Sequence, residues 1–240
     1  MTEPFRLSQH FHEYFEAVPA NDETTRSEVF RLRYDVYCDE LHFEDSERFP
    51  EHEERDEYDE HSVFALLRHR ETGRAAGCVR LVLNHKDPTL ALPLERVCTG
   101  LFDLNKYNPE TIDRARVGEI SRLAVHSFFR RRRGESTTPE GTAEPASYFG
   151  GERHYPLVAM GLFLSSAAYM FNLDLEQIVV MMEPRLARLL RSCGLHFTAI
   201  GPVIEYHGQR GPFRITRADV EAHLGEEANE LLRTLLPIFR

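Results

Sequence analysis

Side chains suited to one buried helix face recur every three or four residues in the first part of the chain, beginning just after Asp22. This spacing predicts an amphipathic helix, with Asp22 or one of the threonines that follow it as the N-cap. We expect the helix to run for about four turns. The residues on its common face are Val29, Phe30, Arg33, Tyr37 and Leu41.

Short apolar runs bounded by glycine, proline and charged residues follow, and they predict strands separated by helices. Residues 61–69 and 75–83 flank the turn Glu71-Thr72-Gly73 and predict a hairpin. Further segments expected to be strands are 117–125, 177–182, 196–200 and 203–207. Segments expected to be helices are 93–98, 156–171, 184–193 and 217–235.

Two stretches show no hydrophobic repeat. Residues 43–60 are acidic and contain proline, which is typical of a long surface loop. Residues 134–154 are rich in glycine, proline, serine and threonine, and we expect a mobile loop insertion there. The remaining elements predict one α/β domain spanning residues 1–240.

Length and composition fit a soluble globular enzyme. The chain has 240 residues, of which 42% are hydrophobic and 28% are charged. Its net charge of -10 argues against a general nucleic-acid binder, whose surface needs a basic excess. The four cysteines form no C-x-x-C pair, which favours reduced thiols over disulfides or a zinc site.

The sequence indicates a cytoplasmic protein without a resident metal or permanently bound cofactor. The first residues are polar and lack the apolar core of a signal peptide. The longest apolar stretch, 156–171, falls short of a membrane span. The histidines show no H-E-x-x-H spacing, and the acidic run 51–60 lacks the glycine of an EF-hand loop.

Charged residues inside predicted strands are the first candidates for chemistry. Arg80 lies within an apolar strand and needs a carboxylate partner, for which Asp56, Asp59 and Glu119 are available. A regular strand would place Glu119 and Arg122 on opposite faces. The pattern leaves two interpretations open, since these charges can bind substrate or can pair with one another as structural ion pairs.

A run of four arginines stands out on this acidic chain. Arg130, Arg131, Arg132 and Arg133 precede Gly134. Their charge suits an acidic partner protein. A solvated charge run without a partner is the alternative.

Three blocks in the first half resemble the acyl-homoserine-lactone synthases. The first block sets an arginine and two aromatic residues at that family's spacing: Arg33, Tyr37 and Phe43. Residues 54–59 match the family's E-x-D-x-[FY]-D element at every specified position, and Glu119 with Arg122 matches its later glutamate and arginine. The resemblance implies a GNAT-like acyltransferase fold, an α/β (α+β) domain with a mixed central β-sheet flanked by helices.

The second half resembles a related group, the acyltransferases associated with the PEP-CTERM/exosortase system, which are grouped with the N-acyl amino acid synthases. The segments that carry this resemblance are 182–190, 193–197, 200–202 and 205–210. It implies transfer of a fatty acyl group from acyl-carrier protein, or from an acyl-coenzyme A, to the amine of an amino acid.

The resemblance also implies roles for single residues. Glu119 is expected to take the proton of the attacking amine, and Tyr206 is expected to protonate the leaving thiolate. The residues expected to bind substrate are Arg33, Tyr37, Phe43, Asp56, Asp59, Arg80 and Arg122. The implied acyl donor is the phosphopantetheine thioester of an acidic acyl-carrier protein, or a coenzyme A thioester. The residues expected to bind it are Arg130, Arg131, Arg132, Arg133 and Gly134.

Departures from the lactone-synthase pattern bear on the substrate. Phe43 replaces a tryptophan, Tyr37 replaces a phenylalanine, and Glu40 stands where that family favours a basic or amide residue. Ser136 interrupts the R/Q-x-x-G-x-G/A loop that holds coenzyme A in GNAT enzymes. The alternatives are a lactone synthase that uses S-adenosylmethionine, and a non-catalytic GNAT-like module that binds an acyl carrier.

Overall fold

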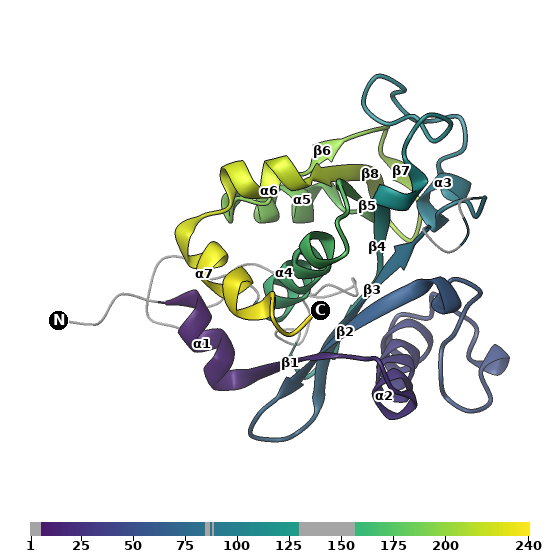
Figure 1. Cartoon of the computed structure of the whole chain (residues 1–240). Helices are drawn as coiled ribbons and strands as arrows, with labels where there is room; N and C mark the ends of the chain where they lie inside the picture. Colours follow the sequence, from purple (N-terminus) through teal and green to yellow (C-terminus); the bar gives the residue numbers. More distant parts are fainter. Residues whose placement is uncertain (1–5, 85–86, 88, 130–156) are drawn as a thin grey trace.

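The computed structural model describes residues 6–84, 87, 89–129 and 157–240 (Figure 1). Its strands form a sheet in the order β1-β2-β3-β4-β5-β8-β6, and β7 pairs with β8. Neighbouring strands are antiparallel except β4 and β5, which are parallel. The strands are β1 (Phe15–Pro19), β2 (Ser62–His69), β3 (Ala75–Leu83), β4 (Val117–Val125), β5 (Gln177–Met182), β6 (Thr198–Ala199), β7 (Ile204–Glu205) and β8 (Gln209–Thr216).

The parallel pair at the centre of the sheet separates part-way along its length. Residues 117–120 of β4 pair with residues 177–180 of β5. Beyond this point β4 continues along β3 to Val125, and β5 continues along β8 to Met182. The carboxyl ends of the two strands therefore part, and this is the region where sheets with parallel strands bind ligands.

Helices cover both faces of the sheet (Figure 1). The first face carries α2, which contacts β2, β3 and β4, whereas α4 lies on the opposite face and is covered by α7, with α1 beside α7. The helices are α1 (Leu7–Tyr14), α2 (Glu23–Tyr34), α3 (Pro93–Val97), α4 (Leu157–Asn172), α5 (Pro184–Ser192), α6 (Arg217–His223) and α7 (Glu226–Leu235).

The first predicted helix is confirmed, with an unexpected end. Asp22 is the N-cap of α2, and its carboxylate accepts the Thr25 N–H at 2.9 Å. After Tyr34 the helix widens into a π-helix over Asp35–Glu40. Wide helical turns of this kind are rare and are frequently found at functional sites.

The hairpin, the strands at 117–125 and 177–182, and the helices at 93–98, 156–171 and 184–193 are confirmed within a few residues. The strands predicted at 196–200 and 203–207 are wrong in extent, because only β6 and β7 form there and each has two residues. The predicted helix 217–235 is two helices, separated at Gly225. The sequence interpretation missed α1, β1 and β8, and Gly211-Pro212 conceals β8 because these two residues are typical of turns.

The apolar character of α4 follows from its position. Nearly all its residues are buried between the sheet and the outer helices α1 and α7. In the described part of the chain, no helix has the length and apolar character needed to cross a membrane.

Candidate active site

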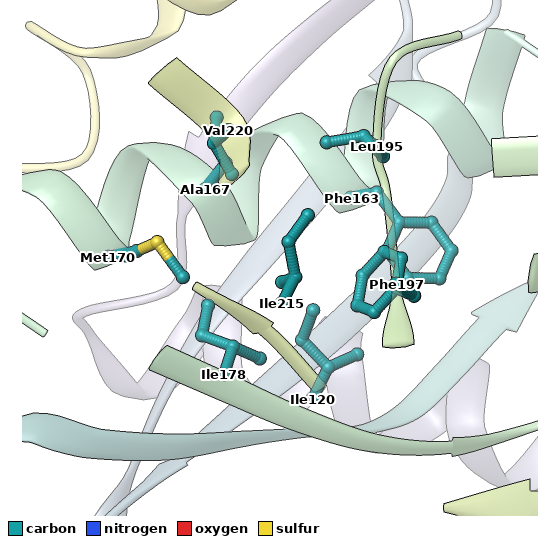
Figure 2. Close-up of a pocket in the computed structure, with 9 residues that line it drawn as sticks. All are labelled: Ile120, Phe163, Ala167, Met170, Ile178, Leu195, Phe197, Ile215 and Val220. Carbon is teal, nitrogen blue, oxygen red and sulfur yellow. The ribbon is translucent and has the colours of Figure 1, made fainter. Parts of the chain in front are cut away.

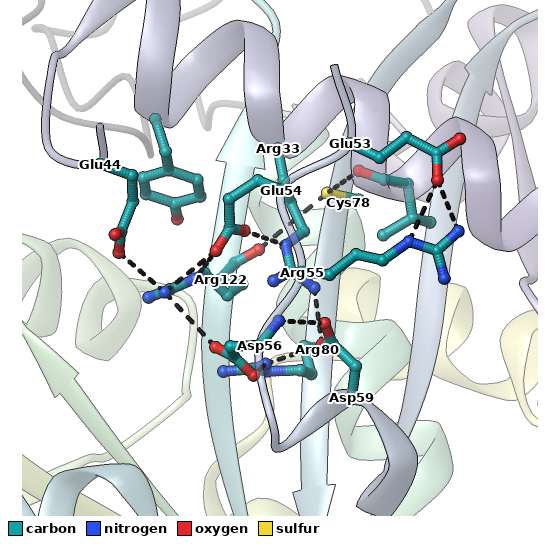
Figure 3. Close-up of polar contacts among 12 residues, drawn as sticks. Arg33, Glu44, Glu53, Glu54, Arg55, Asp56, Asp59, Cys78, Arg80 and Arg122 are labelled. Atoms are coloured by element: carbon teal, nitrogen blue, oxygen red, sulfur yellow. Dashed lines mark hydrogen bonds and ion pairs between the residues drawn. The ribbon is translucent and has the colours of Figure 1, made fainter. Parts of the chain in front are cut away.

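Three arginines and four carboxylates meet on the α2 face of the sheet (Figure 3). The arginines come from three separate elements, namely α2, β3 and β4. The carboxylates come from the loop between the π-helix and β2. The members of this charged cluster are Arg33, Arg80, Arg122, Glu44, Glu54, Asp56 and Asp59.

Asp59 joins the two most deeply buried arginines. Its Oδ1 accepts from Nη1 of Arg33 and from Nη1 of Arg80, each at 2.7 Å. Arg33 Nε donates to Glu54 at 2.5 Å, and Arg80 is bonded to Asp56. Arg33 and Arg80 are 0% and 1% exposed. Because buried guanidinium groups require partners, these two arginines hold the acidic loop against the sheet.

Arg122 connects the same loop to β4 and is the arginine of the charged cluster with exposed surface. Its Nη2 lies 2.9 Å from Glu44 and 3.4 Å from Asp56, and its Nε donates to Glu54 at 3.2 Å. The side chain is 23% exposed, so part of it is accessible to a ligand.

Backbone contacts fix the acidic loop. The Glu54 N–H donates to the Phe30 carbonyl at 3.1 Å, and the Asp56 N–H donates to the Asp59 carboxylate at 2.8 Å. Burial alone would raise the pKa values of Glu54 and Asp56. Their arginine neighbours outweigh burial and hold both pKa values below the ordinary range. Both carboxylates are therefore ionised at neutral pH.

A β-bulge in β4 corrects the prediction that Glu119 and Arg122 lie on opposite faces. Cys78 pairs with Ala124 and Arg80 pairs with Ser121, so β4 uses one more residue than β3 between these pairs. Arg122 has φ +47°, in the left-handed region. The extra residue turns Arg122 toward the loop carboxylates on the α2 face, where Arg80 donates to Ser121 Oγ at 3.0 Å.

Glu119 lies next to the charged cluster, on the last part of β4 before it parts from β5. It is 2% exposed, and its Oε2 accepts the Leu94 N–H from the first turn of α3 at 2.8 Å. Burial raises the pKa of this carboxyl to about 8, even though the Leu94 N–H and Arg80 favour the ionised form. A carboxyl with this pKa can accept a proton near neutral pH.

Aromatic side chains from both halves of the chain meet beside Arg122. The Tyr37 hydroxyl donates to the Leu123 carbonyl at 2.9 Å, and Arg122 lies over the Tyr37 ring. The Phe43 ring stacks on His207 with 4.5 Å between ring centroids. Tyr206 packs edge-on against His207, which brings the β7–β8 hairpin to the charged cluster.

A small apolar pocket lies on the opposite face, between α4 and the sheet (Figure 2). It adjoins the point where β4 and β5 part, because Ile120 and Ile178 belong to its wall. The other lining residues come from α4, β8, α6 and the segment before β6: Phe163, Ala167, Met170, Leu195, Phe197, Ile215 and Val220.

Some expected site residues are not placed. Arg130, Arg131, Arg132, Arg133, Gly134 and the predicted insertion 134–154 lie outside the described residues. Within the described ranges, no group of three or more histidine, cysteine or acidic residues is arranged to hold a metal ion.

The structure also adds residues that the sequence interpretation did not assign to the site. Glu44 and Ser121 contact the arginines of the charged cluster. The E-x-D-x-[FY]-D match included Glu54, but its pairing with both Arg33 and Arg122 required the fold. Glu44 lies close to Phe43 in sequence, and this proximity was the available signal.

Comparisons with known proteins show which fold the chain has. Residues 32–139 match the family model described as the acetyltransferase (GNAT) domain. The chain has a GNAT-like fold. The expected mixed sheet flanked by helices is therefore confirmed. No curated protein sequence matches the chain.

Three solved structures show the same fold at low sequence identity. The acyl-homoserine-lactone synthase LasI superposes with a TM-score of 0.59 at 16% identity, covering 88% of this chain and 95% of LasI. The coenzyme A-dependent synthase BjaI, solved with S-adenosylmethionine and isopentyl-coenzyme A, gives 0.59 at 16% identity, covering 94% and 90%. FeeM, an N-acyl amino acid synthase from uncultured soil microbes, gives 0.58 at 13% identity, covering 88% and 94%.

Proposed function

We propose that this protein is an N-acyltransferase that moves a fatty acyl group from a thioester to the amine of an amino acid. The observation that carries the proposal is Glu119, a buried carboxyl with a pKa near 8 beside Arg80 and Arg122, where β4 and β5 part. An amine attacks a thioester only when it is neutral, so the site needs a proton acceptor of this kind.

The proposed reaction is direct attack without an acyl-enzyme. Glu119 takes a proton from the acceptor ammonium, and the amine nitrogen then bonds to the thioester carbonyl carbon. Backbone N–H groups of β4 beyond Ile120 stabilise the tetrahedral oxyanion. The carbon–sulfur bond then breaks and the thiolate takes up a proton from Tyr206. The nitrogen loses its second proton to solvent water, and Tyr206 regains its proton from the same solvent.

The cysteines support direct attack. All four are buried. Burial raises the pKa of the thiols of Cys38 and Cys98 to about 11 and that of Cys78 to about 12. A nucleophilic cysteine needs a lowered thiol pKa, and these thiols have the opposite shift.

The two substrates would occupy opposite sides of the separated strands. The apolar pocket under α4 suits the start of an acyl chain, since its lining is entirely apolar. On the other side, Arg122 has the exposed surface needed to bind the carboxylate of an amino acid. Arg33 and Arg80 then support the acidic loop rather than touching the acceptor.

The acyl donor is proposed to be acyl-carrier protein, with acyl-coenzyme A as the second possibility. The arginine run favours the carrier protein, and Ser136 disfavours the coenzyme A loop. BjaI, which has the same fold, was solved with isopentyl-coenzyme A, and this supports acyl-coenzyme A as the alternative donor. The likeness of the second half to exosortase-associated acyltransferases supports an amino acid as acceptor.

A lactone synthase that uses S-adenosylmethionine is the second candidate, and one observation favours it. The charged cluster holds four carboxylates against three arginines. This excess of one negative charge suits a cationic acceptor such as a sulfonium.

Product analysis tests the proposal and separates the two candidates. Purified protein is incubated with long-chain acyl-carrier protein, or with acyl-coenzyme A, and with all amino acids plus S-adenosylmethionine. An N-acyl amino acid in the mass spectrum supports the proposal and identifies the acceptor. A lactone supports the second candidate. Carrier binding without any product would contradict both and favour a binding module.

A further inference from the structure

The Tyr58 hydroxyl is a buried polar group that neither the ion pairs nor the core packing explain. Tyr58 is 6% exposed, and its hydroxyl oxygen has no hydrogen-bond partner among the described residues. Burying a hydroxyl without a partner is costly, whereas phenylalanine would fill the same space without this cost. A hydroxyl kept in such a place calls for a ligand that completes its bonding.

The structure holds the Tyr58 ring in one orientation. The Tyr58 N–H donates to Asp56 at 2.9 Å, and the Tyr58 carbonyl accepts from Ser62 Oγ at 2.7 Å. The guanidinium carbons of Arg80 and Arg96 lie 5.7 and 5.0 Å from the ring centroid. The hydroxyl is therefore held in place before a ligand binds, which lowers the entropy cost of binding.

The ring shares its surroundings with Glu119. Tyr58 packs in one apolar cluster with Val82 and Leu94. Val82 is the strand partner of Glu119, and the Leu94 N–H is bonded to its carboxylate. Burial raises the pKa of the phenol to about 12; Arg96 lowers it, and the negative charges of Glu57 and Glu119 raise it further. The hydroxyl thus keeps its proton at neutral pH.

We propose that the Tyr58 hydroxyl is an additional hydrogen-bonding group of the acceptor site and binds the acceptor nitrogen beside Glu119. This inference rests on the proposed function. The phenol oxygen accepts one N–H of the acceptor ammonium and holds the nitrogen while Glu119 takes another proton. The phenol keeps its own proton throughout, so Tyr58 orients the amine and is not the base.

Tyr107 provides a matched control. It lies in the same apolar cluster and is buried as deeply, but its hydroxyl donates to Glu95 at 2.6 Å. Tyr58→Phe removes a hydroxyl that lacks a protein partner, and Tyr107→Phe removes one that has such a partner. Tyr58→Phe should therefore lower activity without lowering stability, and Tyr107→Phe should lower stability with little effect on activity.

The test compares acyl transfer kinetics and thermal unfolding for the wild type, Tyr58→Phe and Tyr107→Phe. Tyr58→Phe should lower kcat/KM for the acceptor about 10- to 100-fold, mainly through KM. KM for the thioester should be unchanged, and the melting temperature should equal or exceed that of the wild type because the uncompensated hydroxyl is removed. Tyr107→Phe should lower the melting temperature and change the kinetic constants by less than about 3-fold.

Two results would overturn the inference while leaving the proposed function intact. One is a Tyr58→Phe variant with the acceptor KM and kcat of the wild type. The other is a fall in its melting temperature as large as that of Tyr107→Phe, which would give the hydroxyl a structural partner. A wild-type protein without any acyl transfer would contradict the proposed function itself, and this inference with it.

Discussion

At the scale of single residues, the site contains two kinds of carboxyl group within a short distance of each other. Glu54 and Asp56 lie among arginines that hold their pKa values down. Glu119 has fewer compensating contacts, and burial raises its pKa to about 8. Environments that push the pKa values of neighbouring acids apart commonly mark different chemical roles. In the proposed mechanism they separate charge compensation from proton transfer.

Glu119→Gln is expected to remove the proton acceptor without unfolding the protein, because the glutamine oxygen can still accept the Leu94 N–H. Turnover should fall by about 10²- to 10⁴-fold. In the wild type, kcat/KM should rise with pH and level off above about 8, as Glu119 becomes ionised. The variant should lose this rise. Full activity in Glu119→Gln would show that another group takes the proton.

The same carboxyl predicts a pH-dependent stability. Its pKa is raised from the ordinary 4.5 to about 8, so its contribution is complete below pH 4.5 and is lost as the pH rises toward 8. Arg80, Arg122 and Glu95 are the charged groups that act on it. Denaturant unfolding between these pH values should show a smaller loss of stability in Glu119→Gln than in the wild type.

Arg33→Met is expected to destabilise the fold, because Glu54 and Asp59 would lose a fully buried partner. Removing one partner of a buried ion pair typically lowers the free energy of unfolding by about 3–5 kcal/mol. Arg31 on the same helix is exposed and pairs with Glu53 at 3.4 Å, so Arg31→Ala should cost less than about 1 kcal/mol. Urea unfolding of the two variants measures the difference. Equal stabilities would argue against the structural role of Arg33.

At the scale of elements, the β-bulge in β4 organises the site. A regular strand would turn Arg122 away from Glu54, and the extra residue returns it to the face that carries Arg80. The period-two pattern of a strand cannot predict this, because a bulge is one irregular residue inside an otherwise ordinary apolar run. The π-helix after α2 has a similar effect for Tyr37, whose hydroxyl reaches the backbone of β4.

Ala167 in α4 tests the apolar pocket. It lines the pocket together with Phe163 and Met170. Ala167→Leu should fill space there and shift the products toward shorter acyl chains, while KM for the acceptor stays within about 3-fold of the wild type. Mass spectrometry of products formed from a mixture of acyl thioesters gives the chain-length profile. An unchanged profile would place the acyl chain elsewhere.

At the scale of the whole molecule, the sequence predicted strands β2 to β5 of the sheet but missed α1, β1 and β8. The hairpin and the two central strands were predictable, because apolar runs bounded by turn residues are specific for strands. Strand β8 was not, since Gly211-Pro212 breaks the strand signal although Pro212 pairs with Met181 in the sheet.

The sequence indicated several of the charged residues that the fold brings together, and not how they are connected. The resemblance of the first half grouped Arg33, Arg80 and Arg122 as substrate-binding residues, but only the fold shows that the first two are enclosed and that the third has exposed surface. Likewise, the sequence identified Tyr58 only as the aromatic position of the E-x-D-x-[FY]-D element. Its unpartnered hydroxyl is a tertiary property that has no signature along the chain.

We propose that the protein transfers an acyl group to an amine with Glu119 as the base. The most direct measurement follows an isotope-labelled amino acid and an acyl-carrier protein thioester, and detects the labelled amide by mass spectrometry in the wild type and in Glu119→Gln. The account predicts a labelled N-acyl amino acid from the wild type and about 10²-fold less or lower from the variant. Absence of the amide in the wild type, or equal amounts from both proteins, would contradict it.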